Sequence, residues 1–498
     1  GINMSGGQFL VGTGVTIGVA GIATFRSGRI DLGDALNNTG LGRDVLVNIT
    51  TGSSNIALGD AALDGTTTGS YNVGVGYAAL GLNSTGSNNV AVGRGALDAN
   101  TTASANTAVG DNALSANTTA ANNTAVGYLA LSTNITGTGN VAVGAQALEN
   151  NTGNYNTAVG LQALDTCTTG ANNTSVGYYS SYSLTTGTKN TALGQSALEG
   201  CTDGTNNVAI GYETGTADWG DSNVAVGYRA LKVNTANNNT AVGSNSGVTN
   251  TTGTKNTSIG GWSLRYNTTG SENTAVGMEA LEDNTTADYN TAVGHRAGAS
   301  ITTGTQNTAV GWGAYDDGDG GYNTAIGALS GTSQTTGNRN TLCGNSSGSG
   351  LTTGSDNTFI GFKAGNATTT ADNNTAMGKE SLYTNTTGAS NVALGREALY
   401  ANTTANANTA VGYRSMYLNT TGADNTACGS IALDANTTGS NNDAFGRNAL
   451  GKNTTGSNNT ALGNNSLSNN TTASDNTAVG VSALFSNSTG TYNTGLGR

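Results

Sequence analysis

The chain has 498 residues, 77 glycines, no proline and a formal charge of −12, and Asn, Thr, Ser, Ala and Gly fill most of it. The negative charge and the lack of clustered Lys and Arg exclude a nucleic-acid partner, which needs a basic surface. The sequence contains no run of about 18 apolar residues, so we expect no membrane-spanning segment.

Residues 1–37 precede the regular pattern of the chain and contain a stretch rich in Val, Ile, Thr and Gly at residues 11–25. β-Branched residues between glycines are typical of short strands joined by tight turns. We therefore expect a β-rich lead-in or N-terminal cap over residues 1–37.

A five-residue motif, Asn-Thr-Ala-Val-Gly with small changes, recurs 28 times from Asn38 to the last residues. Of the 27 intervals between copies, 23 are 17 residues long and four are 16 residues long. So constant a period is typical of a solenoid, in which each repeat is one unit stacked on its neighbours. A disordered chain would have no reason to keep an apolar residue at a fixed phase throughout.

Counting the starting Asn as position 1, the unit reads approximately N-T-A-V-G-x-x-A-L-x-x-N-T-T-G-x-x, as in residues 106–122. Side chains alternate along a strand, so positions 2 and 4 share one face and position 3 lies on the other. Position 4 is almost always Val, Leu or Ile, and we expect it to face the interior together with Leu at position 9. The predicted core includes Val126, Leu131, Val143, Leu148, Val276, Leu281, Val479 and Leu484.

The predicted fold class is all-β: a parallel β-solenoid, or β-roll, of about 28 coils over residues 38–498. At about 4.8 Å per coil the rod would be on the order of 130 Å long. Asn at positions 1 and 12 would form ladders, because an amide can donate to one neighbour and accept from the other. Each coil buries little apolar surface for the residues it orders, so we expect further burial between chains, in a homotrimer of parallel chains.

The repeat has two forms. Between about residues 167 and 368, several coils lack Leu at position 9 and carry Ser181, Gly247, Gly298, Gly348 or Gly365 instead. Three of these coils have an apolar residue in place of Asn at position 12: Leu184, Ile301 and Leu351. We interpret this as a core contact that moves to another wall while the filled volume stays roughly constant. The coils over residues 374–498 return to the regular form.

The four cysteines fall in two columns of the repeat. Cys343 and Cys428 occupy position 4 and are expected to be small, buried substitutes for Val. Cys167 and Cys201 occupy position 12, two repeats apart. Stacked coils would separate them by roughly 10 Å, too far for a disulfide, so we expect free thiols.

The residues offer little chemistry. The single histidine, His295, shares its column with Tyr, Arg, Asp, Lys and Trp, and no His/Cys cluster has metal-ligand spacing. We therefore predict no enzyme activity, no metal site and no cofactor. Aromatic rings beside carboxylates can hold sugars, as could happen around Trp219 and Trp312, but a polar turn at a deleted residue is the favoured interpretation. The candidate glycan or receptor contacts are Trp219, Trp262, Trp312, Tyr178, Tyr182, Tyr315, Asp316, Asp317 and Asp319.

The Asn-Thr-Ala-Val-Gly-x-x-Ala-Leu units at residues 106–114, 273–281 and 476–484 resemble the head repeats of trimeric autotransporter adhesins. They are also similar to repetitive fibre proteins of tailed phages, and residues 14–25 are similar to segments in structural proteins of marine cyanophages. The resemblance implies a homotrimeric, left-handed parallel β-roll at an extracellular location, either a virion tail fibre or a cell surface.

The leading functional hypothesis is therefore a structural fibre shaft of a phage tail fibre that projects a receptor-binding end. Its partners would be two further copies of the chain and other fibre, capsid or tail components at the ends. The alternative is a bacterial cell-surface adhesin that binds glycans or matrix through its irregular middle coils. Ice binding through Thr ladders is a weaker alternative, because the adjacent threonines at positions 13 and 14 point to opposite faces.

Overall fold

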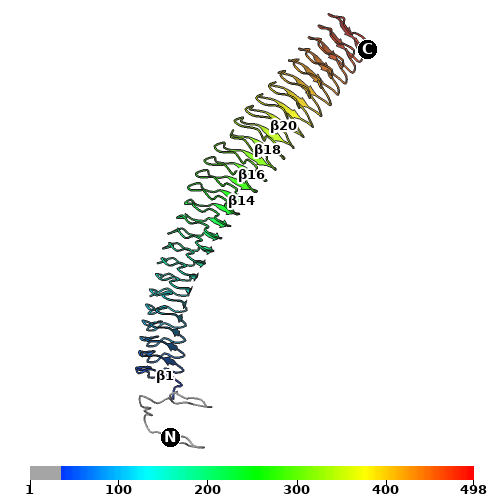
Figure 1. The fold of residues 1–498 in the computed structure, drawn as a ribbon. Helices are drawn as coiled ribbons and strands as arrows, with labels where there is room; N and C mark the ends of the chain where they lie inside the picture. The colour runs from blue at the N-terminus through cyan, green and yellow to red at the C-terminus, as the bar shows by residue number, and fades with distance from the viewer. Residues whose placement is uncertain (1–34, 498) are drawn as a thin grey trace, which may run out of the picture.

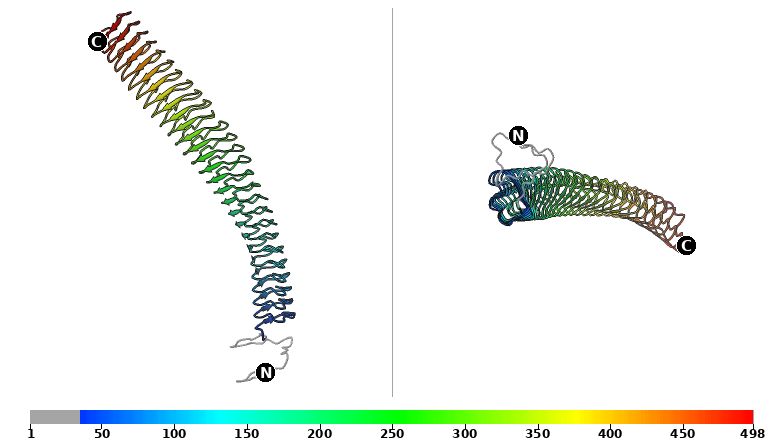
Figure 2. Two further views of the ribbon diagram at one scale, coloured as in Figure 1. Left: turned by 180° about the vertical axis from the view of Figure 1, so that it is seen from behind. Right: turned by 90° about the horizontal axis from the view of Figure 1, so that it is seen from below.

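The computed structural model describes residues 35–497, which form a gently curved rod of stacked coils (Figures 1 and 2). Each coil contributes one short strand, and these residues contain no helix. The chain is thus an all-β parallel β-solenoid with a repeat of about 17 residues, as predicted. The predicted lead-in at residues 1–37 lies, apart from its last three residues, outside the described part of the chain.

The strands cover positions 2 to 4 of the successive repeats. They are β1 (Thr39–Leu41), β2 (Ile56–Leu58), β3 (Val73–Val75), β4 (Val90–Val92), β5 (Thr107–Val109), β6 (Thr124–Val126), β7 (Val141–Val143), β8 (Thr157–Val159), β9 (Thr174–Val176), β10 (Thr191–Leu193), β11 (Val208–Ile210), β12 (Val224–Val226), β13 (Thr240–Val242), β14 (Thr257–Ile259), β15 (Thr274–Val276), β16 (Thr291–Val293), β17 (Thr308–Val310), β18 (Thr324–Ile326), β19 (Thr341–Cys343), β20 (Thr358–Ile360), β21 (Thr375–Met377), β22 (Val392–Leu394), β23 (Thr409–Val411), β24 (Thr426–Cys428), β25 (Asp443–Phe445), β26 (Thr460–Leu462), β27 (Thr477–Val479) and β28 (Thr494–Leu496).

Each strand pairs in parallel with the strand of the next coil, so equivalent positions face each other along the rod. In β6 and β7, for example, Ala125 pairs with Ala142 and Val126 with Val143. The pairing keeps this register where a repeat is one residue shorter, as between Val143 and Val159. The missing residue is therefore absorbed in a turn, and the sheet runs without interruption.

Glycine at position 5 turns the chain out of every strand. Gly127 has φ of +141°, a region that residues with a Cβ rarely adopt. A Cβ on Gly127 would also overlap the carbonyl oxygen of Gly144 in the next coil. The coils approach so closely at this corner that no larger residue fits.

Buried asparagines hold the coils together, which confirms the predicted ladders. The Asn123 backbone N–H donates to Asn106 Oδ1 of the preceding coil at 2.9 Å, and Asn123 Nδ2 donates to the Gly137 carbonyl at 2.9 Å. Asn134, at position 12 of the same coil, donates to the same carbonyl at 2.9 Å. Both amides thus bind the turn at Gly137 within their own coil, while the hydrogen bond between Asn123 and Asn106 connects neighbouring coils.

The interior is lined by small residues at positions 3 and 8 and by Leu at position 9. The prediction is confirmed for Leu131, Leu148 and Leu281, which are fully buried, and Leu484 packs partly buried against the core. For position 4 the prediction is wrong: the side chains of Val126, Val143, Val276 and Val479 lie on the outer face of the sheet, with Val143 36% exposed. The alternation along the strand was predicted correctly, but Ala at position 3 is the inward residue because Leu at position 9 already fills the narrow interior.

The irregular coils keep the interior filled by other routes. Leu184, Ile301 and Leu351 are fully buried, which confirms the predicted exchange between positions 9 and 12. The structure adds a second exchange, because Leu342 and Phe359 replace the usual Ala at position 3 and occupy the space beside Gly331, Gly348 and Gly365. The coil of Gly247 has neither exchange, and a cavity of about 10 Å³ remains there between Leu231 and Leu264. That volume corresponds to about one water molecule.

Two of the four cysteines lie in the interior of the rod and two on the outer face of the sheet. Cys167 and Cys201 are free thiols, as predicted; they are also fully buried, and burial raises the pKa of each thiol to about 12. Cys428 is exposed and Cys343 half-buried, so the prediction that these two are buried is wrong. The reason is the same as for Val126: position 4 points outward.

Candidate functional site: the outer walls of the solenoid

Two of the predicted contact residues lie inside the rod. The Trp219 side chain is 1% exposed, and its Nε1 donates to the Leu231 carbonyl at 3.1 Å. The Tyr315 ring is fully buried; its hydroxyl donates to the Gly320 carbonyl at 3.0 Å and accepts from Asn323 Nδ2 at 2.7 Å. Both rings fill space that a shortened coil and its glycines leave empty, so neither can contact a glycan.

The carboxylates near Tyr315 serve the backbone. Asp319 accepts hydrogen bonds from the backbone N–H groups of Thr302, Thr303 and Gly304 at 2.7–3.0 Å, and from both threonine hydroxyls. Burial opposes ionisation, but these bonds together lower the pKa of Asp319. In regular coils a backbone carbonyl at this position takes the same role, as Thr118 O does for Thr101 and Thr102. Asp319 therefore replaces the acceptor of a turn that has lost one residue.

Asp316 and Asp317 do not join Asp319 in one cluster. Asp316 pairs with Arg296 at 3.2 Å, and burial raises the pKa of the Asp316 carboxyl in spite of that partner. Asp317 is exposed. Asp218 and Asp221 likewise accept from the backbone N–H groups of Thr202 and Thr205, each at 2.8 Å. The polar-turn interpretation thus accounts for Asp218, Asp221 and Asp319.

The remaining predicted aromatic contacts lie on one outer wall in three different coils, and Tyr178 and Tyr182 share one of them. We call the side chains at positions 6, 7 and 10 the charged wall. Trp262 is 40% exposed beneath the Arg265 guanidinium at 5.7 Å, and Trp312 is 54% exposed. Tyr178 is exposed and Tyr182 half-buried, and both have edge contacts with Tyr179, at 4.2 and 4.9 Å between ring centroids.

Ion pairs and stacked rings occupy part of the charged wall internally. Glu213 accepts from Arg229 at 2.8 Å and from Lys232 at 2.6 Å. Further along, a stack of three tyrosine rings, with neighbouring centroids 5.1 and 5.0 Å apart, presents mainly its edges: Tyr383, Tyr400 and Tyr417. The single histidine belongs to this wall, with His295 Nε2 4.0 Å from Glu279 Oε2.

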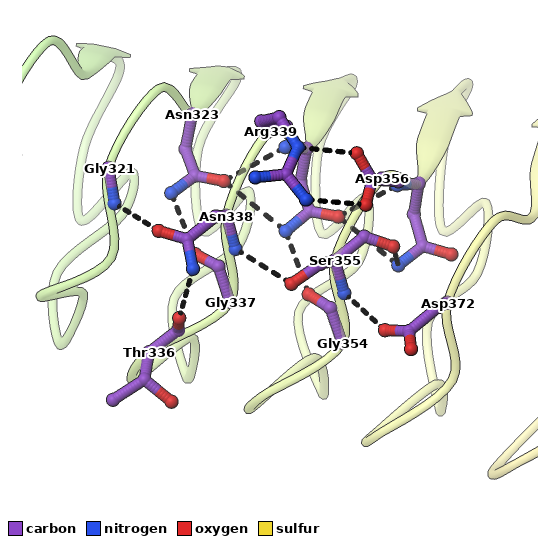
Figure 3. Close-up of polar contacts among 12 residues, drawn as sticks. Gly321, Asn323, Thr336, Gly337, Asn338, Arg339, Gly354, Ser355, Asp356 and Asp372 are labelled. Atoms are coloured by element: carbon purple, nitrogen blue, oxygen red, sulfur yellow. Dashed lines mark hydrogen bonds and ion pairs between the residues drawn. The ribbon is translucent and has the colours of Figure 1, made fainter.

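A further ladder follows the corner before the strand in those coils whose position 16 is polar (Figure 3). Here the side chain at position 16 accepts from the backbone of the preceding coil: Gly321 N–H donates to Asn338 Oδ1 at 2.7 Å, and Asn338 N–H donates to Ser355 Oγ at 3.1 Å. Arg339 and Asp356 form a two-bond ion pair beside it at 2.7 and 2.8 Å. These polar groups are occupied within the rod, as at the other corners.

The outer face of the sheet has no such internal partners. Position 4 carries an apolar side chain in each of the 28 described strands, and none of the 28 is buried. We call this column the outer rank. Its members are Leu41, Leu58, Val75, Val92, Val109, Val126, Val143, Val159, Val176, Leu193, Ile210, Val226, Val242, Ile259, Val276, Val293, Val310, Ile326, Cys343, Ile360, Met377, Leu394, Val411, Cys428, Phe445, Leu462, Val479 and Leu496.

The sequence contained a signal for this surface, namely the sizes of positions 3 and 4. A coil whose inward strand residue is Ala has room for little more, so the larger residue beside it has to point outward. Residues 35–497 contain no group of three or more His, Cys, Asp or Glu placed to hold a metal ion. The same residues contain no helix long and apolar enough to cross a membrane.

No protein-family model matches the chain, and no curated protein matches it either.

Proposed function

We propose that this chain is the structural shaft of an extracellular fibre, of the kind found in phage tail fibres, and that it carries a receptor-binding end away from its attachment point. The observation that supports this most is the uninterrupted stack of 28 coils, in which the buried asparagines bind neighbouring coils. A rod of this kind transmits position and force along its length. The proposed working form is a homotrimer, with other fibre or virion components at its ends and with no catalytic role.

Electron microscopy of the negatively stained chain tests the shaft directly. We expect unbranched rods on the order of 130 Å long, since 28 coils rise by about 4.8 Å each. Deleting two regular repeats, residues 408–441, should shorten the rods by roughly 10 Å without changing their width. Compact particles, or rods whose length does not follow the number of repeats, would contradict the proposal.

A second function, glycan or matrix binding at a cell surface, is favoured by the exposed aromatic residues of the charged wall. Trp262 and Trp312 are 40% and 54% exposed, and Trp312 has the shape and exposure of a sugar platform. A glycan array should then give a signal that Trp262→Ala with Trp312→Ala abolishes. Tyr71→Ala, which removes a 62% exposed ring in another part of the rod, is the matched control and should leave the signal intact.

A further inference from the structure

The outer face of the sheet reverses the usual distribution of apolar residues. Ala125 at position 3 is fully buried, whereas the larger Val126 beside it reaches the surface, and the same holds in most coils, those of Leu342 and Phe359 being exceptions. Such a strand therefore places its small apolar residue inside and its larger one in water. Such an arrangement is unfavourable for an isolated rod, because exposed Val, Leu and Ile gain free energy when they are covered.

The outer rank is large and chemically uniform. Position 6, by contrast, mixes Arg43, Asp60 and Lys379 with aromatic residues, while the outer rank contains no charged side chain in the described strands. If each half-exposed side chain leaves about 50 Å² in water, the rank exposes on the order of 1,400 Å². That exceeds both the few hundred Å² of a typical apolar surface patch and the roughly 800 Å² per partner of a stable interface.

The shape of the rank restricts what can cover it. It is one continuous column with one side chain per coil, repeating at the rise of the coil over all 28 strands. A globular partner would cover only a few levels of such a column. A second copy of this chain matches the repeat at every level when the two rods run parallel.

We infer that the outer rank is the seam at which parallel, in-register copies of this chain pack against one another, so that each level of the rank meets its own equivalents. This rests on the proposed oligomeric shaft and identifies the face that assembles it. The largest member supports the register, because Phe445 pairs along the sheet with the small Cys428 of the preceding coil. Copies in register would bring their Phe445 rings together at one level and leave space beside them at the Cys428 level.

The native cysteines provide the test. In the full-length chain with Cys343→Ser, Cys428 is the remaining thiol of the outer rank, and Cys167 and Cys201 are fully buried. Copper-phenanthroline oxidation of this folded Cys343→Ser protein should then give disulfide-linked dimers on a non-reducing gel. The yield of dimer should not fall when the protein is diluted. The yield should exceed that of the control by at least about tenfold, because the seam places equivalent Cys428 side chains at the same level.

The matched control moves the thiol within one coil. Cys343→Ser with Cys428→Ser and Thr438→Cys places it at exposed position 14, away from the sheet. Dimers formed equally well by this Thr438→Cys control, or no Cys428 dimers in preparations whose rods contain more than one chain, would overturn the seam and leave the shaft standing. Rods that contain a single chain, with Cys428 unlinked, would overturn both the seam and the proposed trimer, and would point to another occupant for the face.

Discussion

The irregular coils over about residues 167–368 and the regular coils that follow reach the same cross-section with different interiors. In the regular coil of residue 391, Leu399 fills the centre and Asn402 the ladder, whereas in the coil of residue 290 the pair is Gly298 and Ile301. Both regions keep Asn at position 1, Gly at position 5 and an apolar outer rank. The comparison shows which features define the solenoid. Different residues can fill the interior, whereas both regions keep the corner glycine, the asparagine ladder and an apolar outer face.

The largest effect on stability should come from the corner glycine at position 5, which both regions share. Gly277→Ala places a Cβ at φ +138° and against the Gly294 carbonyl oxygen. We expect a loss of about 3–5 kcal/mol in the free energy of unfolding, from backbone strain and overlap together. Urea unfolding followed by circular dichroism measures it.

Gly261→Ala is the control for Gly277→Ala, because Gly261 has no positive φ and a Cβ there would meet no atom closer than the Ser244 carbonyl oxygen, at 4.0 Å. It should cost less than half as much. Equal losses for the two variants would show that the corner glycine has no special role.

Phe359→Ala should lower the stability nearly as much, and the loss of protection should be confined to the irregular coils. Phe359 fills the space beside Gly365 and Gly348, so its removal opens a cavity that no neighbouring side chain can close. We expect a loss of about 3–5 kcal/mol in the free energy of unfolding. Hydrogen exchange should locate the lost protection in the coils around Phe359. An effect of less than about 1 kcal/mol would contradict the exchange of core residues described for these coils.

The exchange of core residues between positions 9 and 12 can also be tested by converting a regular coil into the irregular form. Leu399→Gly alone should cost about 2–4 kcal/mol in the free energy of unfolding, because it empties the centre of its coil. Adding Asn402→Ile reproduces the pair of Gly298 and Ile301 and should recover at least half of that loss. Thermal unfolding of the two single variants and the double variant gives the coupling. Additive losses would mean that the two positions do not share one space.

The smallest effect concerns a buried carboxylate just before the irregular region. Asp165 is 7% exposed and its Oδ1 has no hydrogen-bond partner; burial and the Glu149 charge raise its pKa to about 6. Because this pKa lies above the usual value near 4, the fold disfavours the ionised form, and stability falls as the pH rises from about 4 to 6. Asp165→Asn should therefore match the parent chain at pH 4 and be more stable at pH 8 by up to about 2 kcal/mol. Glu149→Gln should give part of the same gain, and a variant no more stable at pH 8 would contradict the assignment.

Much of the fold follows from the sequence because the repeat reports each column 28 times. The constant period predicted the solenoid, and the fixed Asn columns predicted the ladders. The joint change at Gly298 and Ile301 predicted that the apolar core residue can move from position 9 to position 12. The alternation of side chains alone did not show which strand face points inward, since Ala125 and Val126 are both apolar and alternation is the same either way. Side-chain volume decides that question, and Val126, Cys343 and Cys428 therefore lie outside.

The site predictions were wrong for two aromatic residues, Trp219 and Tyr315, which were interpreted as surface groups. Trp219 and Tyr315 appeared beside carboxylates, but the same coils are shortened and rich in glycine, so each ring was needed to fill the interior. Trp262 and Trp312 are exposed because their columns contribute no interior side chain. For Tyr315, Trp262 and Trp312, the direction in which the repeat column points therefore predicts exposure better than residue type does.

The native mass of the full chain tests the central claim, that the outer rank is covered by further copies of the chain. Multi-angle light scattering after gel filtration should give about 148 kDa, three times the chain mass of 49.2 kDa. Val276→Glu with Val293→Glu should lower that mass, whereas Thr286→Glu, on an exposed corner of the same coil as Val276, should not. A parent chain that elutes as a stable particle of 49.2 kDa would contradict the account.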